Sequence, residues 1–247
     1  MQDKQKKDKF IDVRTRLSKN AITAMERLEE AGYEAYIVGG SLRDILMGRE
    51  VHDFDVTSSA RPDEVMKVFS GFKVIPTGLK HGTVTVLIDD EPIEITTFRS
   101  ESGYSDGRHP DRVSFAKSVE DDLGRRDFTM NAMACRINGD IVDLFGGQND
   151  IANKLIRTVG DAKERFSEDG LRILRAIRFA AVLGFKVETD TRDAIHQMAY
   201  MIEKVSEERI ISEFNKIMLS ENPSTYLREY KDIICIFMPE LEACIGF

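Results

Sequence analysis

The chain of 247 residues has no tryptophan and only three cysteines, and no hydrophobic run approaches the ~20 residues of a membrane-spanning helix. The cysteines (Cys135, Cys235 and Cys244) are odd in number and form no Cys-x-x-Cys motif, which excludes a disulfide scaffold or a zinc site built on such pairs. The N-terminal lysines are not followed by an apolar segment, as a secretory signal requires. We therefore expect a reduced, cytoplasmic protein that contacts no membrane.

The sequence also lacks an excess of positive charge, since its formal net charge is −8 at pH 7. This charge argues against a protein that coats nucleic acid, although a local basic groove would be enough to bind RNA. The candidates for such a groove, each of which is also explained as a solvated surface charge, are Arg108, His109, Arg112, Arg125, Arg126, Arg172, Arg175 and Arg178. With 42% hydrophobic and 32% charged residues, the composition is otherwise that of an ordinary globular protein of one or two domains.

A pair of glycines marks the first functional pattern. A strand predicted over residues 34–38 runs into Gly39 and Gly40, and a helix start follows. Glycines let the backbone come close to a bulky anion, and the free N–H groups of a helix start favour a phosphate. A Gly-Gly pair is also found in ordinary turns.

Two aspartates follow the glycines at strand spacing. Asp53 and Asp55 lie on one face of a predicted strand over 53–57, because strand side chains alternate. Paired carboxylates suit Mg²⁺, with substrate phosphates completing the coordination shell. Glu94, in a predicted strand over 93–98, is either a third catalytic carboxylate or an exposed strand residue. A phosphate cradle followed by paired carboxylates predicts phosphoryl or nucleotidyl transfer with two metal ions.

Hydrophobic periodicity predicts the remaining elements. Helices are expected over residues 12–31, 61–70, 117–133, 161–183, 189–203, 206–220 and 223–234, and further strands over 83–88, 134–137 and 141–144. The polar segment 99–112 predicts a long mobile loop. In the helix over 161–183, Asp169 and Arg172 are three residues apart and share a face, either as an intrahelical ion pair or as a functional pair.

Several ordered motifs together resemble those of the tRNA nucleotidyltransferase (CCA-adding enzyme) and bacterial poly(A) polymerase family, the class II nucleotidyltransferases. These motifs are Gly39-Gly40-x-x-Arg43-Asp44, Asp53-x-Asp55, Arg125-Arg126-Asp127-Phe128-Thr129-Met130-Asn131-Ala132 and Glu168-Asp169-Gly170-Leu171-Arg172. In addition, Asp143-Leu144-Phe145-Gly146-Gly147 is similar to the linker between the family's catalytic head and its helical region. The resemblance covers most of the chain.

The resemblance implies an α+β fold. A polymerase-beta-like nucleotidyltransferase head with a mixed sheet is expected over residues 1–155. An all-helical neck with the base-recognition helix follows over 156–225, and residues 226–247 begin a helical body. Family members continue into further helical domains that hold tRNA, so we expect either a short relative or a fragment.

The resemblance also implies the reaction and the residues that perform it. The expected enzyme adds CCA to the tRNA 3′ end from CTP and ATP without a template, releases pyrophosphate and uses Mg²⁺ held by Asp53 and Asp55. The triphosphate cradle comprises Gly39, Gly40, Ser41 and Arg43. Asp169 and Arg172 read the base edge, and the other nucleotide-binding candidates are Arg126, Asp127, Asn131, Arg175 and Arg178. For Arg126, Asp127 and Asn131, helix capping and intrahelical pairing are the alternative.

Two rival functions remain open. A poly(A) polymerase or A-adding enzyme is the nearest, but the Arg-rich segment associated with that branch is not evident at 183–187. The segment around Asp106-Gly107-Arg108 and Pro110 resembles the family loop needed for terminal A addition, which argues against a type that adds only C. The second rival is a non-catalytic nucleotide- or RNA-binding module, and the intact Asp53-x-Asp55 argues against it. No obligate protein partner is inferred.

Overall fold

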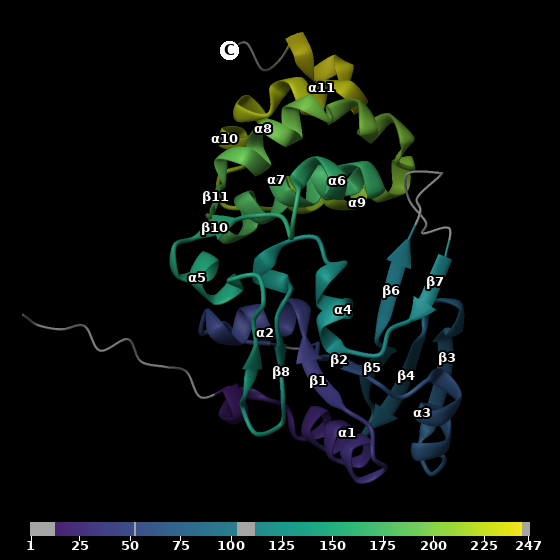
Figure 1. Cartoon of the computed structure of the whole chain (residues 1–247). Coiled ribbons are helices and arrows are strands. Elements are labelled where there is room, and N and C mark those ends of the chain that lie inside the picture. Colours follow the sequence, from purple (N-terminus) through teal and green to yellow (C-terminus); the bar gives the residue numbers. More distant parts are fainter. Residues whose placement is uncertain (1–12, 52, 103–111, 244–247) are drawn as a thin grey trace, which may run out of the picture. The chain divides into compact units, whose positions relative to one another are not determined.

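The computed structural model describes residues 13–51, 53–102 and 112–243, which divide into two compact units (Figure 1). The first unit holds the described residues up to Thr97 together with Ala134–Val142. The second holds Phe98–Met133 and the chain from Asp143 onward. No helix in the described residues is long and apolar enough to cross a membrane. Residues 103–111 of the predicted loop over 99–112, with Arg108 and His109, lie outside the described part.

The first unit is built on one mixed sheet of seven strands. Its order is β3 (Lys73–Gly78), β4 (Thr83–Ile88), β5 (Glu91–Thr97), β2 (Asp55–Ser58), β1 (Ala35–Val38), β8 (Ala134–Cys135) and β9 (Ile141–Val142). Only the β2–β5 pairing is parallel. In β5 the side chains alternate as predicted, because Ile93 and Ile95 are fully buried and Glu94 is exposed. Every residue of β1 is buried, as expected for a central strand.

Helices of the first unit pack on this sheet. They are α1 (Lys19–Glu30), α2 (Gly39–Leu46) and α3 (Pro62–Val68), with short 3₁₀ helices at Val13–Arg16 and Leu79–His81. Helix α1 begins after Ser18, whose hydroxyl accepts a hydrogen bond from the backbone N–H of Ala21 at 3.0 Å. Its buried stripe of Ala24, Met25 and Leu28 faces the sheet at helical spacing. The amphipathic helix predicted at the N-terminus is therefore present, though it starts later than expected.

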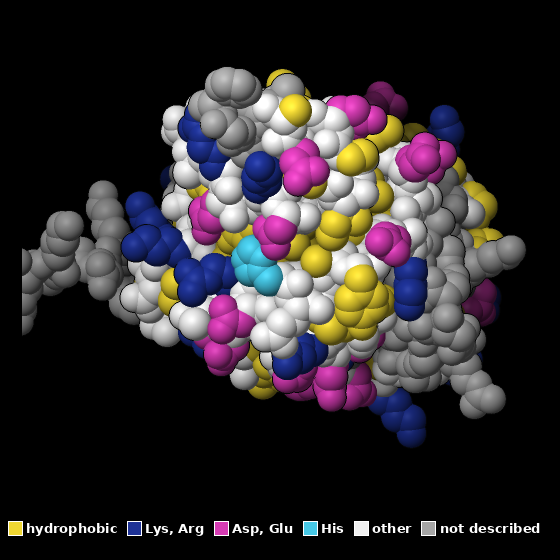
Figure 2. Space-filling view, turned by 90° about the horizontal axis from the view of Figure 1, so that it is seen from above, with side chains coloured by type: hydrophobic (Ala, Val, Ile, Leu, Met, Phe, Trp, Pro, Cys, Tyr) yellow, Lys and Arg dark blue, Asp and Glu magenta, His cyan; other side chains and the backbone are white. Residues whose placement is uncertain are grey.

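The second unit is mainly helical. Its strands are the antiparallel pair β6 (Arg99–Ser102) and β7 (Arg112–Phe115) and the parallel pair β10 (Leu155–Ile156) and β11 (Lys186–Val187). Its helices are α4 (Val119–Gly124), α5 (Gly147–Ala152), α6 (Ala162–Glu168), α7 (Leu171–Leu183), α8 (Thr189–Gln197), α9 (Glu207–Met218), α10 (Pro223–Glu229) and α11 (Lys231–Phe237), with 3₁₀ turns at Thr129–Asn131, Ala199–Lys204 and Pro239–Ala243. Helix α7 is buried along most of its length and packs on α9. Figure 2 looks down on the helices and shows hydrophobic side chains exposed between acidic and basic ones.

The prediction of one helix over 117–133 is wrong beyond Gly124. Helix α4 ends there, and the chain then pairs with a distant segment. The backbone N–H of Thr129 donates to the carbonyl of Arg157 at 2.9 Å, and that of Val159 donates to the carbonyl of Asp127 at 3.0 Å. These tertiary hydrogen bonds replace the intrahelical ones that local propensity favours.

The prediction of a single helix over 161–183 is also wrong, because the helix is interrupted between α6 and α7. Asp169 is extended, with φ −150° and ψ 108°. A Cβ at Gly170 would lie 2.3 Å from the carbonyl oxygen of Met201, so only glycine allows this close approach. The helix predicted over 223–234 is likewise two helices, and the ends of the predicted loop 99–112 are the strands β6 and β7.

Candidate active site

The strand β1 runs directly into the helix α2 at the glycine pair. Gly39 has φ +72°, a left-handed conformation that favours glycine. Among the described residues, no side chain caps this helix start. The hydroxyl of buried Ser41 donates to the carbonyl of Val38 at 2.9 Å and so closes the turn itself. The backbone N–H groups of the first turn therefore offer hydrogen bonds to an anion, whereas the Ser41 hydroxyl is already engaged.

Arg43 lies on the same short helix. Its guanidinium donates to both carboxylate oxygens of Asp44, from Nε at 3.0 Å and from Nη2 at 2.8 Å. The Nη2 atom is also 3.5 Å from where a Cβ of Gly40 would be. Gly40 thus leaves room beside a positive charge that a neighbouring carboxylate holds in place.

The aspartate pair stands at the edge of the sheet where this turn begins. Asp53 and Asp55 are exposed, whereas the side chains between and after them, Phe54 and Val56, are buried. The predicted alternation is therefore confirmed, although β2 starts only at Asp55. Because Ile37 pairs with Val56 in an antiparallel register, the end of β1 and the start of β2 meet at one edge. The glycine turn and Asp55 consequently share that edge.

The donor set at this edge fits a divalent cation. Asp53 and Asp55 supply exposed hard oxygen donors, and substrate phosphates and water would fill the remaining positions. Glu94 is the register partner of Asp55 on the parallel strand β5. In the described part of the chain, however, no three acidic, histidine or cysteine side chains are grouped closely enough to hold a metal. The structure thus brings Glu94 to the neighbouring strand without forming a three-carboxylate cluster.

A second group of predicted residues gathers in the helical unit. They line a cleft of about 420 Å³. Six arginines and two aspartates contribute to its wall, so the cleft carries an excess of positive charge suited to a polyanion. Its lining residues are Arg99, Arg125, Arg126, Asp127, Asp169, Leu171, Arg172, Arg175 and Arg209.

Asp127 and Arg175 form an ion pair in this cleft, in which Asp127 is buried and Arg175 is half-buried. Nη2 of Arg175 lies 2.6 Å from Oδ2 of Asp127, and Oδ1 accepts from the backbone N–H of Phe128 at 2.8 Å. Burial alone would raise the pKa of the Asp127 carboxyl, but Arg175 and the Phe128 N–H more than compensate, and the pKa is lowered. Nδ2 of Asn131 also donates to Oδ1, at 3.4 Å. Asp127 is therefore held by Arg175 on α7, 48 residues away, and not by the intrahelical pairing that was the alternative; its contact with nucleotide stays a prediction.

Of the two alternatives for Asp169 and Arg172, the intrahelical ion pair is absent, because Asp169 precedes α7 and lies outside any helix. Its two carboxylate oxygens accept from Nη1 and Nη2 of Arg209 at 3.2 and 2.7 Å. Arg172 instead pairs with Glu168 and donates to the backbone carbonyl of Arg125 at 3.2 Å. Both predicted residues nevertheless line the cleft. Sequence reasoning missed Arg209, which no local pattern connects to Asp169.

Arg178 differs from the other predicted arginines. It pairs with Glu213 on α9, and its guanidinium lies 3.8 Å from the centre of the Phe179 ring. Burial lowers the pKa of Arg178 despite the neighbouring carboxylate. It does not belong to the residues that line the cleft. In this structure Arg178 joins α7 to α9, and it stays only a predicted nucleotide ligand.

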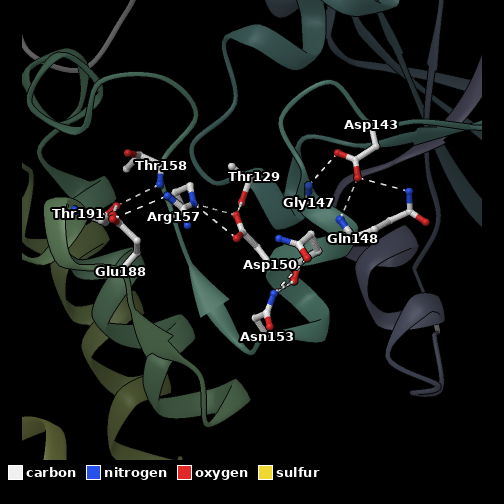
Figure 3. Close-up of polar contacts among 11 residues, drawn as sticks. Thr129, Asp143, Gly147, Gln148, Asp150, Asn153, Arg157, Thr158, Glu188 and Thr191 are labelled. Carbon is white, nitrogen blue, oxygen red and sulfur yellow. Dashed lines mark hydrogen bonds and ion pairs between the residues drawn. The ribbon is translucent and has the colours of Figure 1, made fainter. Parts of the chain in front are cut away.

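The motif that resembles the family linker begins at Asp143, and a second aspartate, Asp150, follows it in α5 (Figure 3). Asp143 accepts from the backbone N–H groups of Gly147 at 2.7 Å and Gln148 at 2.9 Å, and so caps α5. Asp150, buried in α5, accepts from the Thr129 hydroxyl at 2.7 Å and from Arg157 Nε at 3.2 Å. These bonds hold the segment that carries Asp127 and Asn131.

The comparisons with known proteins agree with these features. A family model described as "Poly A polymerase head domain" matches residues 35–157. A second, described as "Probable RNA and SrmB-binding site of polymerase A", matches residues 184–244. The chain belongs to the tRNA nucleotidyltransferase and bacterial poly(A) polymerase family. Its fold is the polymerase-beta-like head followed by a helical neck that the resemblance implied.

Among relatives, the CCA-adding enzyme of Ligilactobacillus salivarius is 50% identical over 214 residues, which are 87% of this chain and 52% of the relative. The CCA-adding enzyme of Bacillus cytotoxicus is 52% identical over 200 residues, covering 81% and 50%. A solved structure of the Bacillus stearothermophilus CCA-adding enzyme in complex with CTP matches with a TM-score of 0.77 and 42% identity, covering 87% of this chain and 50% of that one. The Thermotoga maritima CCA-adding enzyme complexed with tRNA matches with a TM-score of 0.75 and 26% identity, covering 88% and 52%. The chain spans about half the length of these relatives.

Proposed function

We propose that this chain is the nucleotide-transferring part of an enzyme that adds CCA to the 3′ end of tRNA from CTP and ATP and releases pyrophosphate. The observation that carries the proposal is the common sheet edge of the uncapped Gly39–Gly40 helix start and Asp55. This arrangement offers an anion cradle beside a cation site, as nucleotidyl transfer requires. The names of the relatives favour CCA addition over poly(A) synthesis.

In the first unit, Asp53 and Asp55 would hold Mg²⁺. Bound divalent metal lowers the pKa of the attacking 3′-hydroxyl and stabilises the leaving pyrophosphate. The backbone N–H groups after Gly39 bind triphosphate oxygens, and Arg43 adds a positive charge that Asp44 orients. The exposed position of both aspartates leaves their oxygens accessible to metal and substrate.

In the second unit, the arginine-lined cleft binds the nucleotide. Arg126 neutralises triphosphate charge, and Asp169 and Arg172 read the base. Cytosine and adenine both present an amine donor next to a ring-nitrogen acceptor, which a carboxylate and a guanidinium match. Uracil and guanine present the reversed edge, so each would leave two buried polar groups unpaired, at ~1–3 kcal/mol apiece. Base choice thus needs no nucleic-acid template.

We also propose a cytoplasmic location, which tRNA as substrate and the reduced thiol of Cys235 support. The test of the proposed reaction is incorporation of labelled CTP and ATP into tRNA that lacks its last three nucleotides, with and without Mg²⁺. Metal-dependent incorporation of both nucleotides is expected. Incorporation of ATP alone would favour the poly(A) or A-adding alternative. Nucleotide binding without incorporation would favour the non-catalytic module.

A further inference from the structure

A fully buried carboxylate lies behind the arginines of the cleft. Asp122, on α4, has a side chain with 0% exposure. Its Oδ1 atom accepts from Nε and Nη2 of Arg125 at 3.0 and 2.7 Å, and its Oδ2 atom accepts from Nη2 of Arg126 at 3.1 Å. Arg125 and Arg126 line the cleft, whereas Asp122 does not. One carboxylate thus holds two adjacent guanidinium groups, one on each oxygen.

The same carboxylate also contacts a third residue of the cleft wall. The backbone N–H of Arg99, the first residue of β6, donates to Oδ1 of Asp122 at 3.3 Å. Asp122 is therefore in contact with three of the six arginines that line the cleft. It links them although they come from two different segments of the chain.

The charge of Asp122 is maintained in this buried position. Burial alone would raise the pKa of its carboxyl, but Arg126 and Arg125 outweigh that effect and the pKa is lowered. A negative charge without exposed surface cannot itself contact a nucleotide phosphate. Asp122 can instead fix the side chains of the two arginines before a ligand binds. Without Asp122, these long side chains would lose rotamer freedom on binding, and that loss would weaken the affinity for the ligand.

We propose that Asp122 is a positioning residue that fixes Arg125 and Arg126 for binding the triphosphate of the incoming nucleotide. This inference rests on the proposed function, since it takes the arginine-lined cleft as the nucleotide site. The spacing supports it, because Asp122 is three and four residues before the two arginines and reaches both from one turn of α4.

The decisive variant is Asp122→Asn. An asparagine has a single acceptor oxygen, and its amide nitrogen cannot accept from a guanidinium. One of the two arginines must therefore lose its anchor while side-chain volume is almost unchanged. The Kd for CTP and the Kd for inorganic triphosphate should both rise roughly tenfold to hundredfold, the usual worth of a charged hydrogen bond. The ratio of CTP to UTP affinity should stay unchanged, because the base-reading residues are intact.

Glu188→Gln is the matched control. The Glu188 side chain is also largely buried, at 16% exposure, and also pairs with an arginine, Arg157, but neither residue lines the cleft. The control should lower the thermal midpoint as Asp122→Asn does, with CTP affinity unchanged. If both variants weaken CTP binding equally, Asp122 is only a stabilising residue and the proposal is overturned.

The proposal for Asp122 can also be tested on the parent protein, so that the test does not depend on whether a variant folds. The Nε–H group of Arg125, which donates to Asp122 at 3.0 Å, should exchange slowly with solvent in NMR spectra before any CTP is added, because Asp122 already holds that side chain. Exchange that slows only when CTP binds would contradict the proposal. If the parent binds no CTP at all, the proposed function itself fails. Parent binding with an unchanged Kd in folded Asp122→Asn overturns only the role of Asp122.

Discussion

Arg209 holds both carboxylate oxygens of Asp169, with Nη1 and Nη2 at 3.2 and 2.7 Å. The two residues are forty positions apart, and Asp169 lies in the break between α6 and α7. Oδ1 also accepts from the backbone N–H of Leu171 at 3.0 Å, so the direction of the carboxylate is fixed and Oδ2 is the oxygen that keeps acceptor capacity for a further donor. In the proposed function, Arg209 sets the direction from which Asp169 accepts the exocyclic amine of a base.

Replacing Arg209 should relax base choice. In Arg209→Gln the carboxylate of Asp169 loses its charged partner, and we expect discrimination between CTP and UTP to fall about tenfold, or ~1.4 kcal/mol. Steady-state incorporation of each nucleotide on one RNA primer measures this ratio. Arg136→Gln, which alters the ion pair with Glu34 and does not line the cleft, is the control and should keep the parent's preference. An unchanged ratio of CTP to UTP incorporation in Arg209→Gln would show that Arg209 has no part in base selection.

Removing either aspartate of the pair should abolish transfer without unfolding the protein. Asp53→Ala and Asp55→Ala change exposed side chains, so stability should shift by no more than ~0.5 kcal/mol. Incorporation at saturating Mg²⁺ should fall about a thousandfold or more, because no other acidic pair is expected to hold the metal. Asp63→Ala, at an exposed aspartate of α3, should leave incorporation as in the parent. Near-normal turnover in either site variant would remove that aspartate from catalysis.

The left-handed conformation of Gly39 predicts that its replacement lowers both the stability of the fold and the affinity for CTP, whereas replacement of Gly32 lowers stability alone. Gly39→Ala forces a side chain into φ +72°, and Gly32→Ala forces one into φ +89° at an open position. Each should cost about 1 kcal/mol or somewhat more in unfolding free energy, measured in urea. CTP binding should weaken only in Gly39→Ala, where the new Cβ stands beside the triphosphate cradle. Equal CTP affinity in the two variants would exclude a phosphate at this turn.

The buried aspartates predict a loss of stability in acid. Because the folded state lowers the pKa of Asp122 and of Asp127 below the ordinary value of 3.8, the unfolded chain binds protons first as pH falls. The contribution of these two carboxylates to the free energy of unfolding is fully present at pH values above their ordinary pKa. It is lost as the pH falls through their lowered pKa values in the folded state. Urea unfolding of the parent should therefore show constant stability from neutral pH down to about pH 5 and a decline below it.

Asp127→Asn separates this effect from general acid unfolding. The variant should be less stable at neutral pH, since Arg175 loses its partner, but it should lose less stability than the parent between about pH 5 and pH 3. The same loss in both proteins over that range would show that Asp127 does not titrate with folding.

Local patterns predicted the parts of this molecule that depend on neighbours in the sequence. The alternation of Asp53, Phe54 and Asp55 places carboxylates outward and the ring inward, as the structure confirms. The strands around Ile93 and Ile95 follow from the same rule. The glycine turn before α2 was likewise visible as two residues that tolerate unusual φ.

Long-range contacts decided what the sequence could not predict. The helix expected through Asp127 gives way because residues 127–129 bond to residues 157–159. The break at Gly170 depends on the carbonyl of Met201, some thirty residues later. For the same reason the partner of Asp169 was expected on its own helix and is instead Arg209 on α9. Local propensity carries no information about such partners.

Sequencing of product 3′ ends distinguishes addition of CCA from addition of A alone and from the absence of transfer. The parent protein is incubated with tRNA that lacks its last three nucleotides, in the presence of Mg²⁺, CTP and ATP in excess, and the products are read individually. The account predicts that molecules end in a single added C-C-A and that Asp53→Ala adds nothing. A run of A residues, or no added nucleotide in the parent reaction, would contradict it.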